Sequence, residues 1–530
     1  MNMSTVKHLF VVVSVISLLF VYLISLVWPE ASWAYIFIVP LIALGIYDVT
    51  QKHHTLLRLY PVVGHLRYVF ESIRPEIQQY FVEDNLNGTP VNREFRSLIY
   101  ERAKGARDTR PFGTQFDVYR EGYEWVNHSI APKKVMKEPC RITFGGKDCS
   151  QPYDSAIFNI SAMSFGALSK HAIIALNRGA QIGGFSHNTG EGGLSPYHLQ
   201  ENGDLVWQIG TGYFSCRTSE GDFNPELFTK NACHPNVKMI EIKLSQGAKP
   251  GHGGILPAAK VTEEIAQIRN VNMGEDVVSP PAHTAFSTPI ELLQFVQQLR
   301  TLSGGKPVGF KLSVGKTEEF FAICKAMVET GIKPDFITVD GGEGGTGAAP
   351  IEFTNSIGTP LREAVNIVYS ALVGFGLKEE IRLIASGKAF SAFHIFRLLA
   401  LGADTINSAR GMMFALGCIQ SRSCNTNKCP TGIATQDPSR YKALNIDIKG
   451  KRVASYQEKV VTNLREITAA VGLSSPKEIQ AKDLNRRVSG TEIKTYEDIF
   501  PSLEKGCLLH EASVPESWKR VWSRAHASDW

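Results

Sequence analysis

Short runs of β-branched and apolar residues alternate with amphipathic helical patterns from residue 155 to residue 436 of this chain. Each run ends in Gly, Ser or Asn before the next helical pattern begins. Alternation over about 250 residues is typical of a parallel sheet with helical connections, and closure as a (β/α)8 TIM barrel fits this length. An open, doubly wound sheet is the alternative, but no G-x-G-x-x-G follows an early strand.

Seven strands and five helices of such a barrel can be placed from the pattern. The predicted strands are residues 156–162, 184–188, 239–244, 308–312, 336–339, 382–385 and 404–407. The eighth strand is either 206–214 or 276–279. The predicted helices are residues 170–182, 289–302, 317–330, 360–374 and 392–401.

Glycine-rich polar segments follow several of these strands. They are N-T-G-E-G-G (188–193), S-Q-G-A-K-P-G-H-G-G (245–254) and D-G-G-E-G-G-T-G (340–347). Barrel chemistry is located where strands end, and loops so poor in side chains let backbone amides approach a planar or phosphorylated ligand. Two later strands end at S-G-K (386–388) and S-A-R-G (408–411), where barrels often bind phosphate.

Three of the nine cysteines, Cys418, Cys424 and Cys429, fall within twelve residues of each other in the segment 417–436. A structural zinc site usually takes four ligands, whereas this run offers three at unequal spacing. Iron and sulfide suit a cage of thiolates alone better, and three unrelated reduced thiols are the alternative. The other six cysteines are scattered singly, which indicates a reducing compartment for most of the chain.

The first fifty residues have a different composition from the rest. Residues 9–28 carry no charge, and twenty residues at about 1.5 Å each can cross a hydrocarbon core of roughly 30 Å. Fifteen more uncharged residues follow at 33–47, so we expect a membrane hairpin; a cleaved signal peptide is the alternative. Lys7 precedes the first span and Lys52 follows the second, which places both flanks in the cytoplasm.

These patterns divide the chain into four parts. We expect a transmembrane hairpin (1–51, spans 9–28 and 33–49), a mostly helical collar (52–154), the barrel with the cysteine loop 417–436 (155–436), and a helical C-terminal extension (437–530). Basic and aromatic residues alternate between 58 and 74, typical of a surface that lies on the membrane or packs on the barrel. The extension 437–530 has 456–471 as its clearest amphipathic stretch, and we expect the extension to pack on the barrel and cover the cysteine loop. A net charge of +5 gives no indication of nucleic-acid binding.

Five segments, in the same order, resemble the FMN-binding synthase domain of glutamate synthases. They are I-S-A-M-S-F-G-A-L-S (160–169), 186–193, 243–254, D-G-G-E-G-G-T-G-A-A-P (340–350) and the cysteine run 417–436. The resemblance implies an FMN barrel and a 3Fe-4S cluster held by Cys418, Cys424 and Cys429. In that family, electrons enter through the cluster, reduce FMN and pass as hydride to 2-iminoglutarate, made from 2-oxoglutarate and ammonia, to yield glutamate.

The same resemblance assigns roles to single residues. It implies that Lys311 lies beside the flavin N1 and C2=O and stabilises the reduced anion, and that Lys243 is a second catalytic lysine. Lys249 and the amides of Gly251, Gly253 and Gly254 would bind substrate carboxylates. The remaining implied flavin contacts are Ala162, Met163, Ser164, Asn188, Gly341, Gly342, Gly387, Ser408, Ala409 and Arg410. Salt bridges to barrel acids are the alternative role for the three lysines.

The chain also departs from the family pattern. His252 stands where the family has the glutamate of P-G-E-G-G, and we expect neither a glutamine-hydrolysing domain nor a glycine-repeat β-helix. The chain most resembles stand-alone, membrane-anchored proteins that contain a glutamate synthase domain.

We therefore expect a membrane-anchored FMN and iron-sulfur oxidoreductase of EC 1.4 type in the bacterial inner membrane, with its catalytic domain in the cytoplasm. Its donor would be ferredoxin or a reductase subunit, because no NAD(P)H fingerprint is recognisable. The alternatives are another amino or 2-oxo acid as substrate, or a non-enzymatic electron-transfer module.

Overall fold

The structure is a computed structural model that describes residues 3–530. Its internal contacts divide the chain into two units, Met1–Arg93 and Glu94–Trp530. The first unit is helical. Its elements are α1 (Met3–Ser25), a 3-10 turn (Pro29–Ala34), α2 (Tyr35–Thr50), α3 (Thr55–Leu59), α4 (His65–Ile77) and a π turn (Gln78–Val82).

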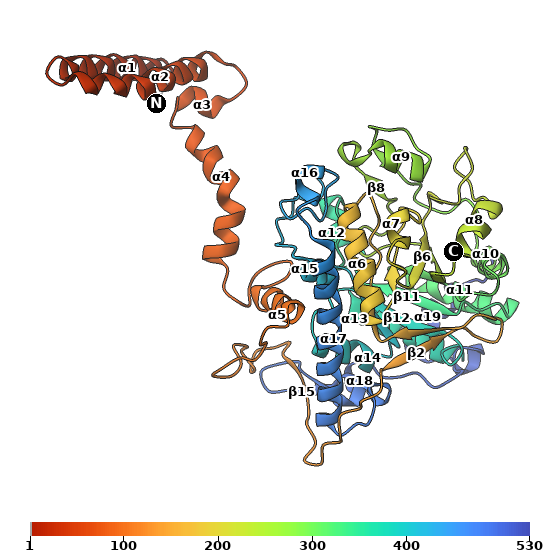
Figure 1. Cartoon of the computed structure of the whole chain (residues 1–530). Helices are drawn as coiled ribbons and strands as arrows, with labels where there is room; N and C mark the ends of the chain where they lie inside the picture. The colour runs from red at the N-terminus through yellow and green to blue at the C-terminus, as the bar shows by residue number, and fades with distance from the viewer. Residues whose placement is uncertain (1–2) are drawn as a thin grey trace. The chain divides into compact units, whose positions relative to one another are not determined.

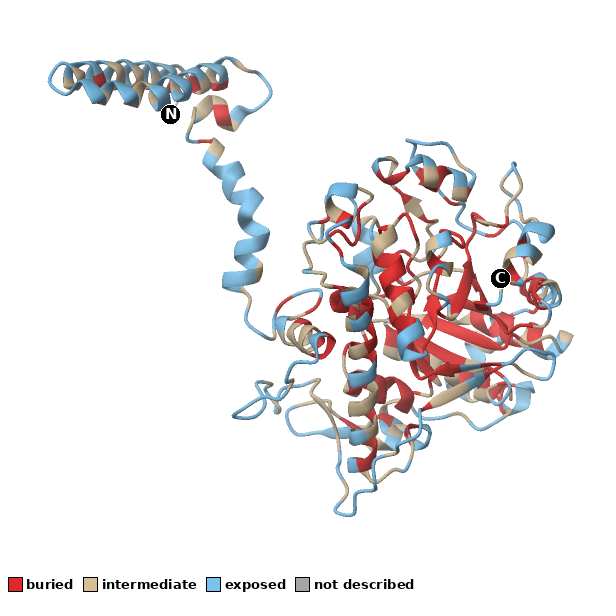
Figure 2. Ribbon diagram, in the orientation of Figure 1, coloured by how far each residue is buried: buried red, intermediate tan, exposed pale blue. Residues whose placement is uncertain are grey.

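Helices α1 and α2 form a hairpin (Figure 1). Gly45 lets them approach closely, since a Cβ at this position would lie 2.3 Å from the ring of Phe10. Both helices expose apolar side chains along their length, and their ribbons in Figure 2 are mostly the pale blue of exposed residues. Helices of this length and composition can cross a membrane, and a signal sequence near an N-terminus has the same composition.

Helix α4, within the collar expected to be mostly helical, continues through Pro75 into the π turn. A proline inside a helix removes one backbone hydrogen bond without always ending the helix.

The second unit is built on a closed barrel of eight parallel strands, so the predicted TIM barrel is confirmed. Their spatial order is that of the chain, and the first strand pairs with the last at Phe158 and Ile406. The barrel strands are β4 (Phe158–Ile160), β5 (His187–Asn188), β6 (Leu205–Ile209), β7 (Val237–Lys243), β10 (Val308–Leu312), β11 (Phe336–Asp340), β12 (Arg382–Ser386) and β13 (Thr405–Ser408). The remaining barrel strand is β6, which overlaps the first alternative, 206–214. The second alternative, 276–279, contains β9 (Val277–Val278), which pairs with β8 (Ile255–Leu256) outside the barrel.

Helices surround the strands, which Figure 2 shows as the buried centre of this unit. The helices between barrel strands are α6 (Lys170–Gly183), α7 (Pro196–Leu199), α8 (Pro225–Ala232), α9 (Glu263–Arg269), α10 (Pro289–Leu302), α11 (Thr317–Thr330), α12 (Ile351–Ser356), α13 (Leu361–Gly374) and α14 (Ala392–Ala400). Side chains at their first residues cap several of them: Ser169 accepts from the amide of Ala172 at the start of α6, and Thr288 does the same for Glu291 at the start of α10.

The remaining elements pack around the barrel. Phe144 and Tyr153, from an antiparallel pair of strands, pack with Val206, Met239 and Phe336 in one buried core. The other elements are α5 (Arg93–Lys104), β1 (Glu124–Val126), β2 (Arg141–Phe144), β3 (Tyr153–Ala156), α15 (Arg410–Leu416), α16 (Pro438–Tyr441), α17 (Ile446–Val471), β14 (Leu484–Arg487), β15 (Ile493–Thr495), α18 (Tyr496–Ile499) and α19 (Glu516–Arg524).

The C-terminal extension packs on the barrel through α17, which lies alongside α6 in Figure 1. Glycines permit this close approach, because a Cβ on Gly179 would lie 2.6 Å from Val453 and 3.0 Å from the carbonyl of Gly450. The start of α17 also reaches the cysteine loop, where a Cβ on Gly417 would lie 2.8 Å from the ammonium of Lys449.

Candidate functional site at the carboxyl ends of the barrel strands

The two predicted catalytic lysines lie side by side. Lys243 at the end of β7 is the register partner of Lys311 on β10, and both are buried. Lys243 forms an ion pair of 2.7 Å with Glu191, and Lys311 lies 3.8 Å from a carboxylate oxygen of Asp340. Each lysine therefore has a barrel acid near it, the alternative that the sequence left open, and both are held where the strands end.

Glu241, two residues before Lys243 on the same strand β7, carries a buried carboxylate. Glu241 accepts hydrogen bonds from Asn188 (2.8 Å), Gln208 (2.7 Å) and Thr338 (2.6 Å), so four strands meet at one side chain. The side-chain oxygen of Asn188 also accepts from the amide of Gly190 (3.0 Å). Asn188 was predicted to contact the flavin. In the structure its side chain hydrogen-bonds to Glu241 and Gly190, beneath the site.

Three cations gather around Glu191. Lys243, Lys249 and Arg269 all interact electrostatically with this carboxylate. Burial raises the pKa of Glu191, but Lys243, Lys249 and Arg269 outweigh it and hold that pKa below its usual value. Burial lowers the pKa of Lys249 to about 8, although Glu191 opposes the shift, and burial likewise lowers the pKa of Arg269 to about 10. Three cations against one carboxylate leave an excess of positive charge, which suits an acidic ligand.

Arg269 was not identified from the sequence. It ends α9, a helix in the long excursion between β7 and β10, and no pattern marks it. Its guanidinium donates to the carbonyl of Phe165 (3.0 Å) and lies 5.0 Å from the ring centroid of Phe214. Its Nε is buried and has no hydrogen-bond partner within residues 3–530. Glu191 could have been noticed as the single charge within N-T-G-E-G-G.

The predicted substrate loop, with Gly251, Gly253 and Gly254, lies against this group. A Cβ on Gly254 would meet a carboxylate oxygen of Glu191 at 2.7 Å, and a Cβ on Gly253 would meet the carbonyl of Ser279 at 1.8 Å. Only glycine fits at Gly253, where a side chain would meet backbone, whereas a side chain at Gly254 would displace the carboxylate of Glu191. His252 between them bonds the carbonyl of Gly253 through Nδ1 (2.9 Å) and meets the ring of Phe353 edge-on.

The ends of β12 and β13 bring two cations together. Arg410 begins α15 and donates to the carbonyl of Glu343 (3.1 Å), while Lys388 follows Gly387. Burial lowers the pKa of Lys388, and the charge of Arg410 lowers it further. Lys388 was quoted in the S-G-K turn but not singled out. Two half-buried cations that repel each other suit an anionic group such as a phosphate.

The other predicted flavin contacts lie on neighbouring loops. Gly190, at φ +67, lets its loop meet the one after β4, since a Cβ there would lie 2.8 Å from the amide of Ser164. The amide of Met163 donates to the carbonyl of Asn188 (3.3 Å), next to Ala162. Gly341 and Gly342 donate their amides to Ser386 (3.1 Å) and Thr359 (2.8 Å), and the hydroxyl of Ser408 donates to Ala389 (2.8 Å). The backbone of Gly387 lies against Leu361, and Ala409 precedes α15.

The three cysteines of the loop interact with one another. Burial raises the pKa of Cys418 to about 12, and the charges of Cys424 and Cys429 add to that shift. Burial also raises the pKa of Cys429, but the hydroxyl of Thr431 and the amides of Ala434, Thr431 and Ile433 outweigh it and lower that pKa below its usual value. Amides that surround a thiolate are typical of iron-sulfur sites, whose potentials depend on hydrogen bonds to sulfur.

Among residues 3–530, no three His, Cys, Asp or Glu side chains are grouped so that they could hold one metal ion. A multi-iron cluster takes one thiolate for each iron, so its ligands lie farther apart than those of a single ion.

Residues far away in the sequence reach this loop. Tyr100 of α5 donates its hydroxyl to the carbonyl of Cys418 (2.5 Å), and Arg96 of the same helix lowers the pKa of the Cys418 thiol. Lys260, in the excursion that carries Arg269, interacts with Cys424 and Cys429 and donates to the carbonyl of Ala167 (2.9 Å). None of the three was predicted from the sequence, because only the folded chain brings them to the cysteines.

The cysteine loop is also fastened to the loop after β4. Gln436 donates through its side-chain amide to the carbonyls of Gly166 and Leu168, both at 2.9 Å. The amide of Ser169 donates to Ile433 (2.8 Å). The loop expected at the flavin edge and the loop that carries the thiols are thus one continuous hydrogen-bonded structure.

Comparisons with known proteins agree on one family. The conserved region in glutamate synthase matches residues 140–474. The glutamate synthase large subunit-like protein YerD of Bacillus subtilis is 37% identical over 470 residues, which cover 81% of this chain and 89% of that protein. The archaeal glutamate synthase [NADPH] of Methanocaldococcus jannaschii is 33% identical over 71% of this chain and 70% of that protein.

Among solved structures, flavocytochrome b2 aligns over 82% of this chain and 98% of that one, at a TM-score of 0.43 and 13% identity. Mandelate oxidase aligns over 81% of this chain and 99% of that one, at a TM-score of 0.42 and 13% identity. A likeness of this size says nothing about ligands or function.

Proposed function

Because this chain belongs to the glutamate synthase family and is a glutamate synthase-like oxidoreductase, we propose that it forms glutamate from 2-oxoglutarate and ammonia with FMN and an iron-sulfur cluster as its redox groups. The observation that carries the proposal is the cationic group of Lys243, Lys249 and Arg269 at the mouth of the barrel. Ammonia condenses with the keto group of 2-oxoglutarate and releases water, and two electrons and two protons convert the resulting imine to the amine.

Different residues bind the substrate, stabilise charge and hold the cofactors. Lys249 and Arg269 bind the two carboxylates of the substrate through charge-assisted hydrogen bonds, and Glu191 holds Lys243 in place. Lys311, on the strand beside Lys243, places a positive charge where negative charge forms on reduction. Lys388 and Arg410 take the phosphate of FMN. When bound, FMN supplies hydride transfer, and a 3Fe-4S cluster on Cys418, Cys424 and Cys429 supplies single electrons.

We place the electron donor outside this chain. Ferredoxin or a partner reductase is the class of donor that the cysteine loop supports, because the thiols lie in a loop beyond the barrel and the sequence has no recognisable dinucleotide fingerprint after an early strand. The apolar α1–α2 hairpin supports anchoring in the bacterial inner membrane with the barrel in the cytoplasm, which the cations that flank the hairpin favour.

A second substrate is favoured by one observation. His252 replaces an acidic residue of the family pattern and lies between the two glycines that contact Glu191 and Ser279. An imidazole in place of a carboxylate alters the charge and shape next to the substrate loop. A different amino or 2-oxo acid is therefore the alternative substrate class.

The experiment is an anaerobic assay of the purified full chain with reduced ferredoxin, 2-oxoglutarate and either ammonium or glutamine. The proposal predicts glutamate in amounts that depend on 2-oxoglutarate and on ammonium. Oxidation of the reduced protein by another 2-oxo acid, with no response to 2-oxoglutarate, would transfer the assignment to the alternative class. A control with His252→Glu shows whether this position sets the preference between the two substrates.

A further inference from the structure

Helix α4 presents an apolar face that nothing in its own unit covers. Every residue from 66 to 78 is exposed, as the pale blue ribbon of α4 in Figure 2 shows. Val69 (51% exposed), Phe70 (63%), Ile73 (42%) and Ile77 (43%) follow the spacing of three and four residues that gathers side chains on one face of a helix. Leu66 belongs to the same face.

A helix of this kind needs a partner. Isolated helices shorter than about 12–15 residues are marginal in water, and most helices in proteins are stabilised by packing of an apolar face. Helix α4 has 13 residues and buries none of them. Its opposite face is polar and carries Arg67, which pairs with Glu71 (3.8 Å). This division of faces is typical of a helix that lies at a boundary between water and an apolar phase.

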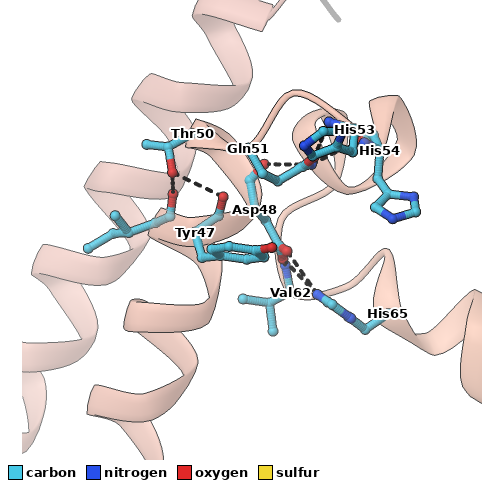
Figure 3. Close-up of polar contacts among 9 residues, drawn as sticks. Tyr47, Asp48, Thr50, Gln51, His53, His54, Val62 and His65 are labelled. Carbon is cyan, nitrogen blue, oxygen red and sulfur yellow. Dashed lines mark hydrogen bonds and ion pairs between the residues drawn. The ribbon is translucent and has the colours of Figure 1, made fainter.

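The direction of α4 is fixed at its start by a buried carboxylate (Figure 3). Asp48, fully buried near the end of α2, accepts from the amide of Val62 (2.8 Å) and from Nε2 of His65 (2.9 Å). Val62 has φ +63, a conformation that a β-branched residue rarely adopts. Asp48 thus holds a sharp turn between α2 and α4, and Gln51 orders the intervening segment by accepting from the amides of His53 and His54.

This turn sends α4 across the direction of the hairpin, as Figure 1 shows for this unit. Helices that cross a bilayer run along its normal, apart from a modest tilt. A helix that leaves such a hairpin at a sharp turn therefore runs along the membrane surface, at the depth where the second span ends.

The charges near α4 fit such a surface. Lys52, Arg58, Arg67 and Arg74 surround the apolar face in the sequence, against Glu71 and Glu76. Basic residues next to a membrane span are attracted to anionic headgroups, and a tyrosine such as Tyr60 is enriched at the interface.

We propose that α4 is an interfacial helix that lies in the surface of the membrane spanned by α1 and α2, with Val69, Phe70, Ile73 and Ile77 among the acyl chains. The inference goes beyond the catalytic proposal and rests only on the proposed membrane location. The Asp48–His65 contact ties the start of α4 to the end of α2 and so fixes the depth of α4 in the membrane.

The test uses the full chain in vesicles that contain phosphatidylglycerol, with the photo-crosslinking residue p-benzoylphenylalanine at one position at a time. Phe70→p-benzoylphenylalanine probes the apolar face of α4. Tyr68→p-benzoylphenylalanine is the matched aromatic control on the opposite face, and Leu19→p-benzoylphenylalanine in α1 reports on the hairpin itself. After irradiation, mass spectrometry identifies what each position has captured.

The proposal predicts lipid adducts at Phe70 and Leu19, and at least a fivefold lower yield at Tyr68. Lipid at Leu19 with protein adducts at Phe70, whether to the barrel or to a second copy, would overturn the inference and leave the membrane location standing. Equal lipid capture at Phe70 and Tyr68 would also overturn it, because an interfacial helix has one wet face. No lipid at Leu19 would refute the location and the inference together, while the catalytic proposal is judged separately by glutamate formation.

Discussion

Ser169 donates its hydroxyl to the carbonyl oxygen of Gly432 over 2.7 Å, although 263 residues separate them in the chain. Ser169 closes the loop expected at the flavin edge, and Gly432 lies three residues beyond Cys429. The two loops that the proposed electron path must join are therefore bonded to each other. Substitutions near either loop therefore test whether the two loops act together in electron transfer.

Replacing Lys260 by Met should lower the midpoint potential of the cluster. A buried positive charge near the thiolates favours the reduced, more negative cluster, and a unit charge about 10 Å away at an effective dielectric of about 20 contributes on the order of 50–100 mV. An EPR-monitored redox titration measures the shift. Lys306→Met is the control, because Lys306 is also buried and donates to the carbonyls of Ala232 and His234, away from the cysteines. Equal potentials in both variants would remove Lys260 from this role.

Substrate binding should weaken as the pH rises above about 8. Burial lowers the pKa of Lys249 to that value, and a neutral amine no longer attracts a carboxylate. The KM for 2-oxoglutarate should therefore rise up to about tenfold for each pH unit above the pKa. In Lys249→Arg the guanidinium stays charged, so the rise should move to higher pH. A profile that is the same in both proteins would contradict a carboxylate contact at Lys249.

Replacing Glu124 by Gln should destabilise the second unit by about 3 kcal/mol, because it removes a buried carboxylate from the half-buried arginines that pair with it. Glu124 is 7% exposed, and it pairs with Arg397 (2.8 Å) and with Arg362, while Tyr496 donates to it (2.6 Å). These links tie β1 to α13, α14 and α18. Glu121→Gln, at an exposed carboxylate nearby, is the control in chemical unfolding.

The same pair of variants has a defined pH dependence. Burial raises the pKa of Glu124, but the arginines and Tyr496 outweigh it and leave the pKa below its usual value. A depressed pKa contributes stability that is complete above the unfolded value of about 4.3 and is lost as the pH falls through the folded value. The difference between wild type and Glu124→Gln should be full at neutral pH and vanish in acid. A difference that grows in acid would show that another group dominates.

Replacing Lys311 by Ala should make the flavin harder to reduce and leave the iron content unchanged. The reduced flavin anion loses a neighbouring positive charge, so its midpoint potential should fall, whereas Lys311→Arg should keep most of it. Spectroelectrochemical titration of the bound flavin measures this. An unmoved potential would mean that the ion pair with Asp340 is the whole role of Lys311.

The barrel could be predicted from the sequence because its strands are buried on both faces. The segment 308–312, with its run V-G-F-K-L, is a strand with the predicted bounds, and α10 and α11 also begin and end where the helical pattern does. The strand β5 has only two residues, so its length could not be read from a hydrophobic run.

The parts of the site that were missed depend on distant contacts. Arg269 and Lys260 come from one excursion between β7 and β10, and Tyr100 approaches Cys418 across 318 residues of sequence. The spacing of residues along a short stretch of sequence does not show which distant residues come into contact in the fold. Glu191 differs, because a lone charge among glycines at a strand end is a local feature.

The most direct test of the account is the cofactor content of the anaerobically purified full chain and of its Cys424→Ala variant. Wild type should release FMN on denaturation and contain iron and acid-labile sulfide. Cys424→Ala removes one of three thiolates from a cluster with no spare ligand, so it should lose the iron and sulfide and keep the FMN. Full iron in the variant, or FAD or no flavin in the wild type, would contradict the account.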